Sequence, residues 1–419
     1  MLPRPNLLRA LAARAWGACA RTPARTVHSG SPITSTLNTH PPSTHYVMPT
    51  FRVMDESGAL LPGAALEPEL TQEVILAAYR TMVRAWVMDT LFYDSQRQGR
   101  ISFYLTSYGE EGAVVGSALA LQPDDDVLAQ YREVSLLLWR GYTVEQVADQ
   151  CFSSVDDPGK GRMMPVHYGS PKLHFQTISS PLGTQIPQAA GIAYAHKMDG
   201  NGRVVACYFG EGAASESDFH AGVNIAATTK VPVIFFCRNN QWAISTPSSE
   251  QYGGDGIAGR GLAFGLHTIR VDAGDVFAVF AATKAARAIA LGRGVEGGGT
   301  RPVLIESMGY RESHHSTSDD STRYRSVEDI DAWRLKSNPV RRLRLFLEAR
   351  GWWSAEQEAE LVAKEKALVL STIAAVEAKP KYPLSGLFED VYKEKPPHLA
   401  EQEAELAAHL KRYPAAPGH

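Results

Sequence analysis

The stretch RVVACYFGEGAASESDFHAGVNIAATTKVPVIFFCRNN, residues 203–240, contains two strand-like apolar runs that each end in a polar motif. Gly-Glu-Gly at 210–212 follows the run 203–209, and Asn-Asn at 239–240 follows the run 231–237. The 26 residues between the two motifs are enough for one helical crossover, so the two strands are predicted to be parallel neighbours. Their ends then meet at one edge of a sheet, where open α/β proteins bind ligands.

This edge would bring together a carboxylate from Glu211 and an amide from Asn240. Such hard oxygen ligands suit magnesium, which completes its octahedral shell with water and substrate phosphates. Gly210 and Gly212 would let a phosphate approach the backbone closely. The plain alternative is that the glycines only turn the chain and that Asn239 and its neighbour only begin a loop.

Strand and helix signals continue to alternate on both sides of this stretch. The expected elements are helices over 69–98, 127–139, 144–151, 184–198 and 277–291 and strands over 271–275 and 302–307. A chain in which strands and helices alternate forms a parallel sheet. We therefore expect an α/β fold in which helices cover both faces of the sheet.

Composition divides the 419-residue chain into four predicted regions. They are a presequence (1–32), an extended arm (33–65), an α/β domain (66–327) and a helical C-terminal region (328–419). The arm is rich in Pro, Thr and Ser and could lie on a partner. Glu, Lys and Ala repeat over 354–378, which predicts a solvated helix that caps the domain. With 44% hydrophobic and 21% charged residues, the chain is expected to be globular.

Charge is distributed unevenly along the chain. Residues 1–50 hold five Arg and no acidic residue, so the formal charge of −3 becomes −8 for the remainder, with 37 basic against 45 acidic residues. An acidic body offers no electrostatic basis for binding nucleic acid. No apolar run approaches the roughly 20 residues that span a bilayer. Neither nucleic-acid binding nor membrane insertion is therefore expected.

The N-terminal segment has the makeup of a mitochondrial presequence, with Arg residues spaced among Leu, Ala and Trp and with Ser and Thr toward its end. Cleavage is expected between positions 25 and 35, which would place the mature protein in the mitochondrial matrix. A disordered basic tail is the alternative. Cys19 would leave with the presequence, Cys207 and Cys237 lie in apolar strands, and Cys151 has no CxxC partner. The pattern favours neither a disulfide framework nor a zinc site.

Two short segments could contribute to a site at the sheet edge. Gln130-Tyr131-Arg132 places a guanidinium fork beside a phenol, a pairing suited to a diphosphate, although a single Arg is often a surface residue. Residues 179–185 (SSPLGTQ) open a helix with several hydroxyls and an amide, much of which ordinary N-capping explains.

A third segment, residues 310–326, brings two His and three Arg beside Ser316 and Ser326. Histidine titrates near neutral pH, so His314 or His315 could hold a proton or contact a phosphate. A zinc-binding His pair and a solvated loop without a role are the alternatives.

Together these motifs resemble the alpha subunits of thiamine-dependent branched-chain 2-oxoacid dehydrogenases. The paired motifs are similar to the Gly-Asp-Gly and Asn-Asn of thiamine diphosphate enzymes, with Glu211 in place of the usual Asp. The resemblance runs from about Pro49 to the C-terminus and includes SQRQGRISFY, GKGRMMPVHYG, TISSPLGTQIPQA, CYFGEGAASE, FFCRNN, AISTPSSEQY, GDGIA and HHSTSDDS.

The resemblance implies functional residues by position. It implies magnesium held by Glu211, Asn240 and the backbone carbonyl of Trp242, and a structural potassium ion near Ser179, Pro181, Thr184 and Gln185. It implies a thiamine diphosphate site formed by Gln130, Tyr131, Arg132, Ser180, Leu182, Gly210, Gly212, Ala213, Arg238 and His315, with His315 also in a catalytic role. Ser316 and Ser326 match the phosphorylated serines of the family.

The resemblance also implies the activity and the partners. The reaction is oxidative decarboxylation of branched-chain 2-oxo acids from valine, leucine and isoleucine, followed by transfer of the acyl group to the lipoyl group of an acyltransferase core. A separate beta subunit is expected to complete each site in an assembly of two alpha and two beta chains, and a dedicated kinase and phosphatase are expected to act on the serines. The alternatives are the alpha subunit of a pyruvate or acetoin dehydrogenase and a noncatalytic scaffold subunit.

The chain departs from the family pattern in three places. Trp242 stands where the family has Tyr, which is harmless if only its carbonyl binds metal. Gln241 replaces a Gly and is expected to strain the turn if φ must be positive there. Glu312-Ser313 replaces Ile-Gly, which leaves the conformation of the following loop open.

Overall fold

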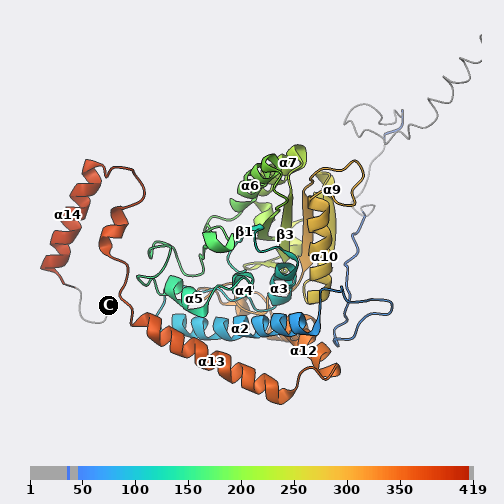
Figure 1. The fold of residues 1–419 in the computed structure, drawn as a ribbon, viewed down its shortest axis with the longest axis horizontal. Helices are drawn as coiled ribbons and strands as arrows, with labels where there is room; N and C mark the ends of the chain where they lie inside the picture. Colours follow the sequence, from blue (N-terminus) through green and yellow to red (C-terminus); the bar gives the residue numbers. More distant parts are fainter. Residues whose placement is uncertain (1–34, 38–45, 415–419) are drawn as a thin grey trace, which may run out of the picture. The chain divides into compact units, whose positions relative to one another are not determined.

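In the computed structural model, which describes residues 35–37 and 46–414, a five-stranded parallel sheet forms the centre (Figure 1). The strand order is β1-β2-β3-β7-β6. The strands are β1 (Asp126–Leu128), β2 (Val205–Gly210), β3 (Val233–Asn239), β6 (His267–Asp272) and β7 (Val303–Met308), with a short antiparallel pair β4 (Trp242–Ala243) and β5 (Thr246–Pro247). The predicted α/β fold with a parallel sheet is confirmed. The predicted presequence, with Cys19, lies outside the described residues.

Helices lie on both faces of the sheet, as predicted, and α2 runs alongside α13 beneath it (Figure 1). The helices are α2 (Gln72–Arg97), α3 (Glu111–Ala120), α4 (Val134–Trp139), α5 (Val144–Cys151), α6 (Gln185–Asp199), α7 (Ser217–Thr229), α8 (Ser248–Gln251), α9 (Ala258–Ala263), α10 (Val276–Ala290), α11 (Val327–Ser337), α12 (Pro339–Ala349), α13 (Ala355–Glu377) and α14 (Pro397–Arg412).

Successive side chains of the central strands point to opposite faces and build two cores. On β2, Cys207 and Phe209 pack in the core under α6 and α7. Tyr208 packs with Phe236 of β3 in the core of the other face, which α2, α3 and α10 complete. Both faces of these strands are therefore apolar, as expected of a sheet covered by helices on both sides.

The predicted helix over 127–139 is wrong in its first half. Residues 126–128 form β1, and helix α4 begins only at Val134. Between them, the Glu133 carboxylate accepts hydrogen bonds from the backbone N–H groups of Gln130, Tyr131 and Arg132. These amides bind a side chain instead of helical carbonyls, so the segment is a loop.

Two other predicted elements are shifted or differently placed. The strand expected over 271–275 is β6, which ends at Asp272, because the Asp275 side chain caps α10 by accepting N–H bonds from Phe277 and Ala278. The helix expected over 354–378 is present as α13, but it is not simply solvated. It buries one side against α2 and α5, and its buried Glu365 pairs with Arg84 at 2.8 Å.

The described part of the N-terminal arm lies on its own chain. Phe51 pairs with Val271 as a parallel bridge at the edge of β6. The backbone N–H groups of Val53 and Met54 donate to Asp275 at 2.7 and 2.6 Å. These contacts extend the sheet region beyond β6 and cover its edge.

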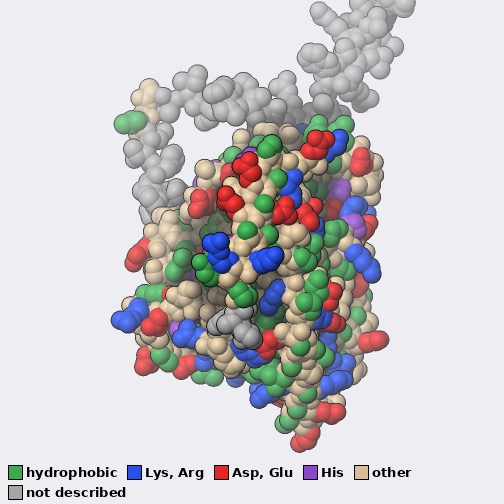
Figure 2. All heavy atoms as spheres, turned by 90° about the vertical axis from the view of Figure 1, so that its left-hand side faces the viewer, with side chains coloured by type: hydrophobic (Ala, Val, Ile, Leu, Met, Phe, Trp, Pro, Cys, Tyr) green, Lys and Arg blue, Asp and Glu red, His purple; other side chains and the backbone are tan. Residues whose placement is uncertain are grey.

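Acidic and basic side chains are interspersed on the face of the molecule shown in Figure 2. Among the described helices, none combines the length and the apolar character needed to cross a membrane.

Candidate functional site

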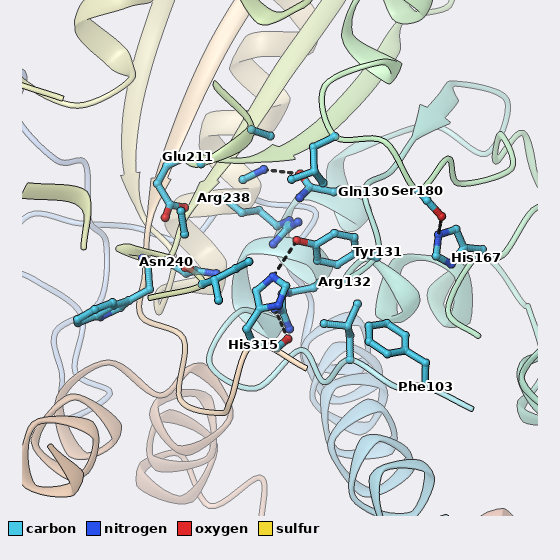
Figure 3. Close-up of a pocket in the computed structure, with 18 of the residues that line it drawn as sticks. Phe103, Gln130, Tyr131, Arg132, His167, Ser180, Glu211, Arg238, Asn240 and His315 are labelled. Carbon is cyan, nitrogen blue, oxygen red and sulfur yellow. Dashed lines mark hydrogen bonds between the residues drawn. The ribbon is translucent and has the colours of Figure 1, made fainter. Parts of the chain in front are cut away.

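A cavity of about 370 Å³ lies at the carboxyl ends of β2 and β3 (Figure 3). The structure brings together here the predicted cofactor residues Gln130, Tyr131, Arg132, Ser180, Leu182, Gly210, Gly212, Ala213, Arg238 and His315 and the predicted magnesium ligands Glu211, Asn240 and Trp242. The parallel pairing of β2 with β3 explains why the two halves of the motif meet. The individual roles of these residues stay predictions.

The loop before α4 is shaped by a residue that sequence reasoning missed. Glu133 is 1% exposed, and its Oε2 binds the three backbone N–H groups of residues 130–132 at 2.9 to 3.1 Å. This contact presents Gln130 to β2, where Gly210 N–H donates to Gln130 Oε1 at 2.7 Å. A charged residue directly after the predicted Gln-Tyr-Arg segment was the available sequence signal.

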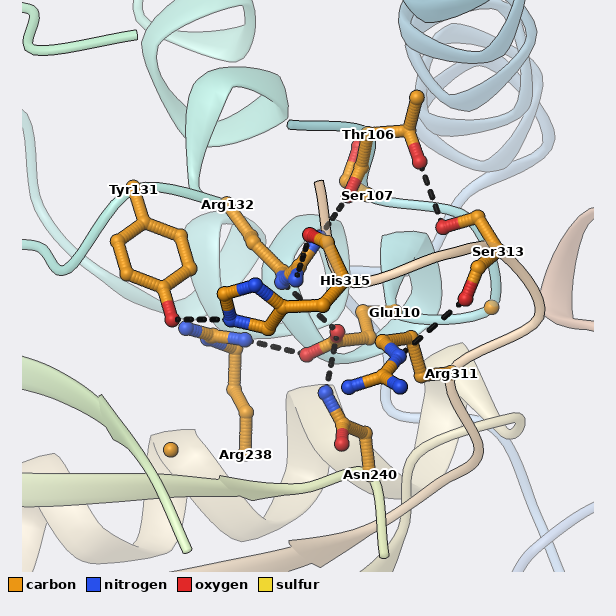
Figure 4. A network of polar contacts seen from close by, with 12 residues as sticks. Thr106, Ser107, Glu110, Tyr131, Arg132, Arg238, Asn240, Arg311, Ser313 and His315 are labelled. Atoms are coloured by element: carbon orange, nitrogen blue, oxygen red, sulfur yellow. Dashed lines mark hydrogen bonds and ion pairs between the residues drawn. The ribbon is translucent and has the colours of Figure 1, made fainter. Parts of the chain in front are cut away.

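Two carboxylates and two guanidinium groups form a buried network beside the cavity, and Figure 4 shows Glu110 with Arg132 and Arg238. Arg238 binds both Glu133 and Glu110, and Arg132 Nε lies 3.6 Å from Glu110. Although burial opposes it, Arg238 and then Arg132 lower the pKa of Glu110, so its carboxylate stays charged. Glu110 was not predicted either.

Arg238 has one nitrogen without a partner. Its second terminal nitrogen is buried and makes no hydrogen bond among the described residues, although Arg238 lines the cavity. An unsatisfied buried guanidinium donor costs free energy that an anion in the cavity would recover. The site therefore fits an anionic group such as a diphosphate.

The Gly210-to-Gly212 turn passes close to the opposite wall of the cavity. A Cβ atom on Gly212 would lie 2.6 Å from the Ala243 Cβ, closer than carbon atoms can pack. Glycine is therefore required at position 212 by the close approach of the two segments.

Glu211 is 1% exposed and accepts a 3.4 Å side-chain hydrogen bond from Gln251. Burial raises the pKa of Glu211 to about 7, and the nearby Glu110 contributes to the rise. Asn240 donates its amide N–H to Glu110 at 2.8 Å, which leaves its oxygen directed to the other side, where Trp242 N–H donates at 3.2 Å. A divalent cation beside these oxygens would favour the charged form of Glu211. The donor set fits magnesium.

The described residues contain no group of three or more His, Cys, Asp or Glu that could hold a metal ion. A magnesium site here would therefore use one carboxylate, one amide oxygen and a backbone carbonyl, as predicted, with the remaining ligands from a phosphate and water.

Gln241 has a φ of 70°, so the condition under which this departure was expected to strain the turn is met. Such a conformation costs a non-glycine residue about 1 kcal/mol or more. Two hydrogen bonds offset the cost: Gln241 N–H donates to Asn239 Oδ1 at 3.1 Å, and its side chain donates to the Gly309 carbonyl at 2.9 Å.

The predicted potassium ligands lie together on the turn into α6 but do not line the cavity. Thr184 donates its hydroxyl to the Pro181 carbonyl at 3.1 Å, and Gln185 donates its side-chain N–H to the Tyr208 carbonyl at 3.0 Å. Ser179 is the fourth member. Hydroxyl and carbonyl oxygens are the ligand types of a potassium ion, and the site stays a prediction.

His315 reaches the cavity from the loop after β7 and faces Tyr131, whose hydroxyl lies 3.3 Å from His315 Nε2 (Figure 3). Burial, Arg132 and Arg311 lower the pKa of His315 to about 3. The expectation of a histidine that titrates near neutral pH is therefore wrong for this environment. The ring is neutral, and the positive charge of the site comes from the arginines.

A further pair closes the opposite end of the cavity. His167 Nε2 lies 2.7 Å from Ser180 Oγ, and His167 Nδ1 lies 3.1 Å from the Pro165 carbonyl. If Nδ1 carries the proton, Nε2 accepts from Ser180. His167 was within a quoted motif but was not predicted as a site residue.

The two serines matched to phosphorylation sites differ in environment. Ser316 is 7% exposed and accepts a hydrogen bond from Ser318 N–H at 3.2 Å. Ser326 is exposed and caps α11 by accepting from Asp329 N–H at 3.0 Å.

Comparison with known proteins identifies what this chain is similar to. Residues 79–385 match the family model described as "Dehydrogenase E1 component". The chain is 53% identical over 367 residues to the 2-oxoisovalerate dehydrogenase subunit alpha, mitochondrial, of Caenorhabditis elegans, covering 87% of this chain and 83% of that protein. It is 52% identical over 366 residues to the protein of the same name from Homo sapiens, covering 87% of this chain and 81% of that protein.

Proposed function

The chain belongs to the dehydrogenase E1 component family, and on this premise we propose that it works as the alpha-type subunit of a mitochondrial branched-chain 2-oxoacid dehydrogenase. It takes part in the thiamine-dependent oxidative decarboxylation of 2-oxo acids such as 2-oxoisovalerate. The observation that carries the proposal is the joining of Glu211, Asn240 and the unpaired Arg238 nitrogen in one cavity.

Thiamine diphosphate, when bound, supplies the nucleophilic carbon and the electron sink for decarboxylation. Arg238 and Arg132 would bind its diphosphate, and the backbone at Gly212 would approach it closely. Glu211, Asn240 and the Trp242 carbonyl would hold magnesium against the same phosphates. Ser180 and Leu182 would contact the apolar end. Potassium at the turn before α6 is a proposal of the same kind.

His315 would act at the reacting end of the cavity. Its neutral imidazole can donate or accept a hydrogen bond, and a bound dianion would raise its pKa by stabilising the protonated form. Tyr131 and the Arg132 contact with the His315 carbonyl, at 2.8 Å, orient the ring.

A beta subunit and the other components of the complex are the partners of an alpha subunit. The described cavity contains one carboxylate, Glu211, and this one is proposed for the metal. We assign the carboxylate that activates the cofactor to the beta chain, in an assembly of two alpha and two beta chains. The lipoyl group of the acyltransferase core would receive the acyl group.

Calorimetric titration of thiamine diphosphate with magnesium tests the proposal in the chain co-expressed with its beta partner. Asn240→Ala is expected to lose binding, because it removes a metal ligand and the bond to Glu110. Asn224→Ala, at an exposed position of α7, is the matched control. Loss in both variants, or in neither, contradicts the metal assignment. Turnover of 3-methyl-2-oxobutanoate compared with pyruvate then separates this function from that of a pyruvate or acetoin dehydrogenase.

We further propose that phosphorylation at Ser316 stops turnover. A phosphate adds close to two negative charges beside His315, in a place where the Ser316 side chain is buried. Desolvation and repulsion from a bound diphosphate would displace the loop. A kinase must therefore reach Ser316 in an opened loop, whereas Ser326 is exposed in place.

Replacement of Ser316 by Glu is expected to reduce turnover of the assembled enzyme at least tenfold, because a buried unpaired carboxylate costs several kcal/mol. Ser318→Glu is the control, since Ser318 is exposed two residues away. Equal activity of the two variants would count against the proposal.

A further inference from the structure

Glu312 is a buried carboxylate between the sheet and the loop that carries His315. Its side chain is 5% exposed. Asn338 Nδ2 donates to both of its oxygens, at 2.9 and 3.0 Å, and Arg334 Nε lies 3.4 Å away. Its own backbone N–H donates to the Tyr108 carbonyl at 3.2 Å. The residue thus joins the loop to the start of α12 and to the segment before α3.

Burying the Glu312 carboxylate costs free energy unless its contacts compensate for the lost hydration. The Arg334 side chain is 51% exposed and also binds Asp331, so it gives Glu312 little compensation. Burial raises the pKa of Glu312, and the pKa of the neighbouring Glu111 is raised by burial and by Glu312. An apolar residue would avoid these costs. The gain must come from what the bond to Asn338 fixes in place.

Asn338 is itself rigidly held. It is the N-cap of α12, where its Oδ1 accepts from Arg341 N–H at 2.7 Å, and Pro339 occupies the first helical position. Its oxygen and its NH2 group are therefore used separately. The oxygen caps the helix, and the NH2 group binds Glu312.

Three residues after Glu312, His315 has its own backbone contacts, to Asp319 Oδ2 at 2.7 Å and from Arg132 at 2.8 Å, and it lies between two attachments of the loop to residues 104–106. On one side, Thr106 Oγ1 donates to Ser313 Oγ at 2.7 Å (Figure 4). On the other, Thr317 N–H donates to the Tyr104 carbonyl at 3.0 Å, and Tyr104 N–H donates to Thr317 Oγ1 at 3.1 Å. The attachment at Ser313 is a single hydrogen bond between two hydroxyl groups. Glu312, the residue directly before Ser313, anchors the loop on that side.

We propose that Glu312 is a positioning residue for His315, which acts by tying the loop to α12 through Asn338. The proposal rests on the cofactor site proposed above. With Glu312 unbound, residues 313–317 would open more often, and both the placement of His315 and the burial of Ser316 would be weakened. A binding-competent loop would then be populated for a smaller fraction of the time, which weakens apparent cofactor affinity by that fraction.

The test uses the assembled enzyme and two independent variants. Glu312→Leu removes the acceptor while keeping a side chain of similar size, and Asn338→Ser keeps an N-cap oxygen and removes the NH2 group that binds both Glu312 oxygens. Each is expected to speed hydrogen exchange at 313–317 about tenfold and to weaken thiamine diphosphate binding several-fold, with turnover at saturating cofactor within about twofold of wild type. The double variant is expected to add nothing further, because one bond is lost in both.

Glu312→Gln is the conservative variant. Its rate of hydrogen exchange at 313–317 is expected to stay close to that of wild type, because its amide oxygen can still accept a hydrogen bond from Asn338. Asp331→Asn is the matched control, since it removes the other partner of Arg334 and leaves Glu312 bound. Unchanged exchange in both Glu312→Leu and Asn338→Ser overturns the proposal, as does additivity of the two. Absence of cofactor binding in the wild-type enzyme would refute the proposed site instead, while the exchange result would still decide the role of Glu312.

Discussion

His315 is the residue whose surroundings most affect the pH response of the site. Its ordinary pKa of 6.5 falls to about 3 through burial and the charges of Arg132 and Arg311. Above pH 6.5 the folded and unfolded chains both hold it neutral, so its titration does not reduce stability there. As the pH falls below 6.5, the imidazole binds a proton in the unfolded chain but stays neutral in the folded chain. Stability is then lost at up to about 1.4 kcal/mol per pH unit.

His315→Gln removes this titration. The variant is therefore expected to lose less stability than wild type when the pH is lowered from about 7 to about 5.5, by about 1 kcal/mol. Thermal midpoints of the two proteins at both pH values measure the difference. An equal drop in both would show that His315 does not contribute to acid sensitivity.

At the scale of single residues, the sequence was sufficient to predict those site residues whose side-chain type and place after a strand indicate a metal ligand. Glu211 and Asn240 each directly follow a strand and were predicted to meet. Glu110 and Glu133 were missed, because their importance comes from Arg238, which is 128 and 105 positions away along the chain. A buried carboxylate with a distant partner looks like any surface acid until the fold pairs them.

Among the secondary-structure elements, β7 holds the site together through one side chain. Glu306 is fully buried and binds Asn239 of β3 at 2.8 Å and Arg270 of β6 at 2.9 Å. It also accepts the backbone N–H groups of residues 257 and 258 at the start of α9, at 2.8 and 2.9 Å. The Asn-Asn turn is therefore placed by three neighbouring elements.

Gly256 lies against this carboxylate with a φ of +64°, and an added Cβ would be 2.6 Å from Glu306 Oε1. Gly256→Ala is expected to destabilise the protein by about 2 to 4 kcal/mol, from backbone strain plus overpacking. Gly254→Ala is the matched control, since nothing lies within 4 Å of its added Cβ. Urea unfolding of both variants measures this, and a similar midpoint in the two would contradict the account.

The element predictions succeeded where periodicity continued and failed where a side chain interrupted it. Residues 127–139 are apolar enough for a helix, yet the Glu133 carboxylate captures the amides that would begin it. For α13, the charged pattern predicted a solvated helix. The sequence did not predict its buried side, because a glutamate such as Glu365 is expected at the surface unless a partner such as Arg84 of α2 is known to pair with it.

For the molecule as a whole, the open side of the cavity is apolar. Met164, Leu182 and Ile244 line it and are 48%, 39% and 51% exposed. Exposed apolar side chains around a functional cavity mark a surface for a partner. An alpha subunit needs a beta chain for its activity, and this rim is where that chain would both bind and contribute its carboxylate. Assembly and cofactor binding should then depend on the same residues.

Replacing Ile244 by Asp tests that dependence, and the change adds no backbone strain, since Ile244 has a φ of 55° that Asp tolerates better. A buried unpaired charge at an interface costs several kcal/mol, so association with the beta chain is expected to weaken at least tenfold, with cofactor binding lost in parallel. Sedimentation of the co-expressed chains measures assembly. Leu370→Asp, at a 45% exposed position of α13, is the control and should assemble normally. If Ile244→Asp assembles like this control, the beta chain binds elsewhere, and the second carboxylate must reach the cavity by another route.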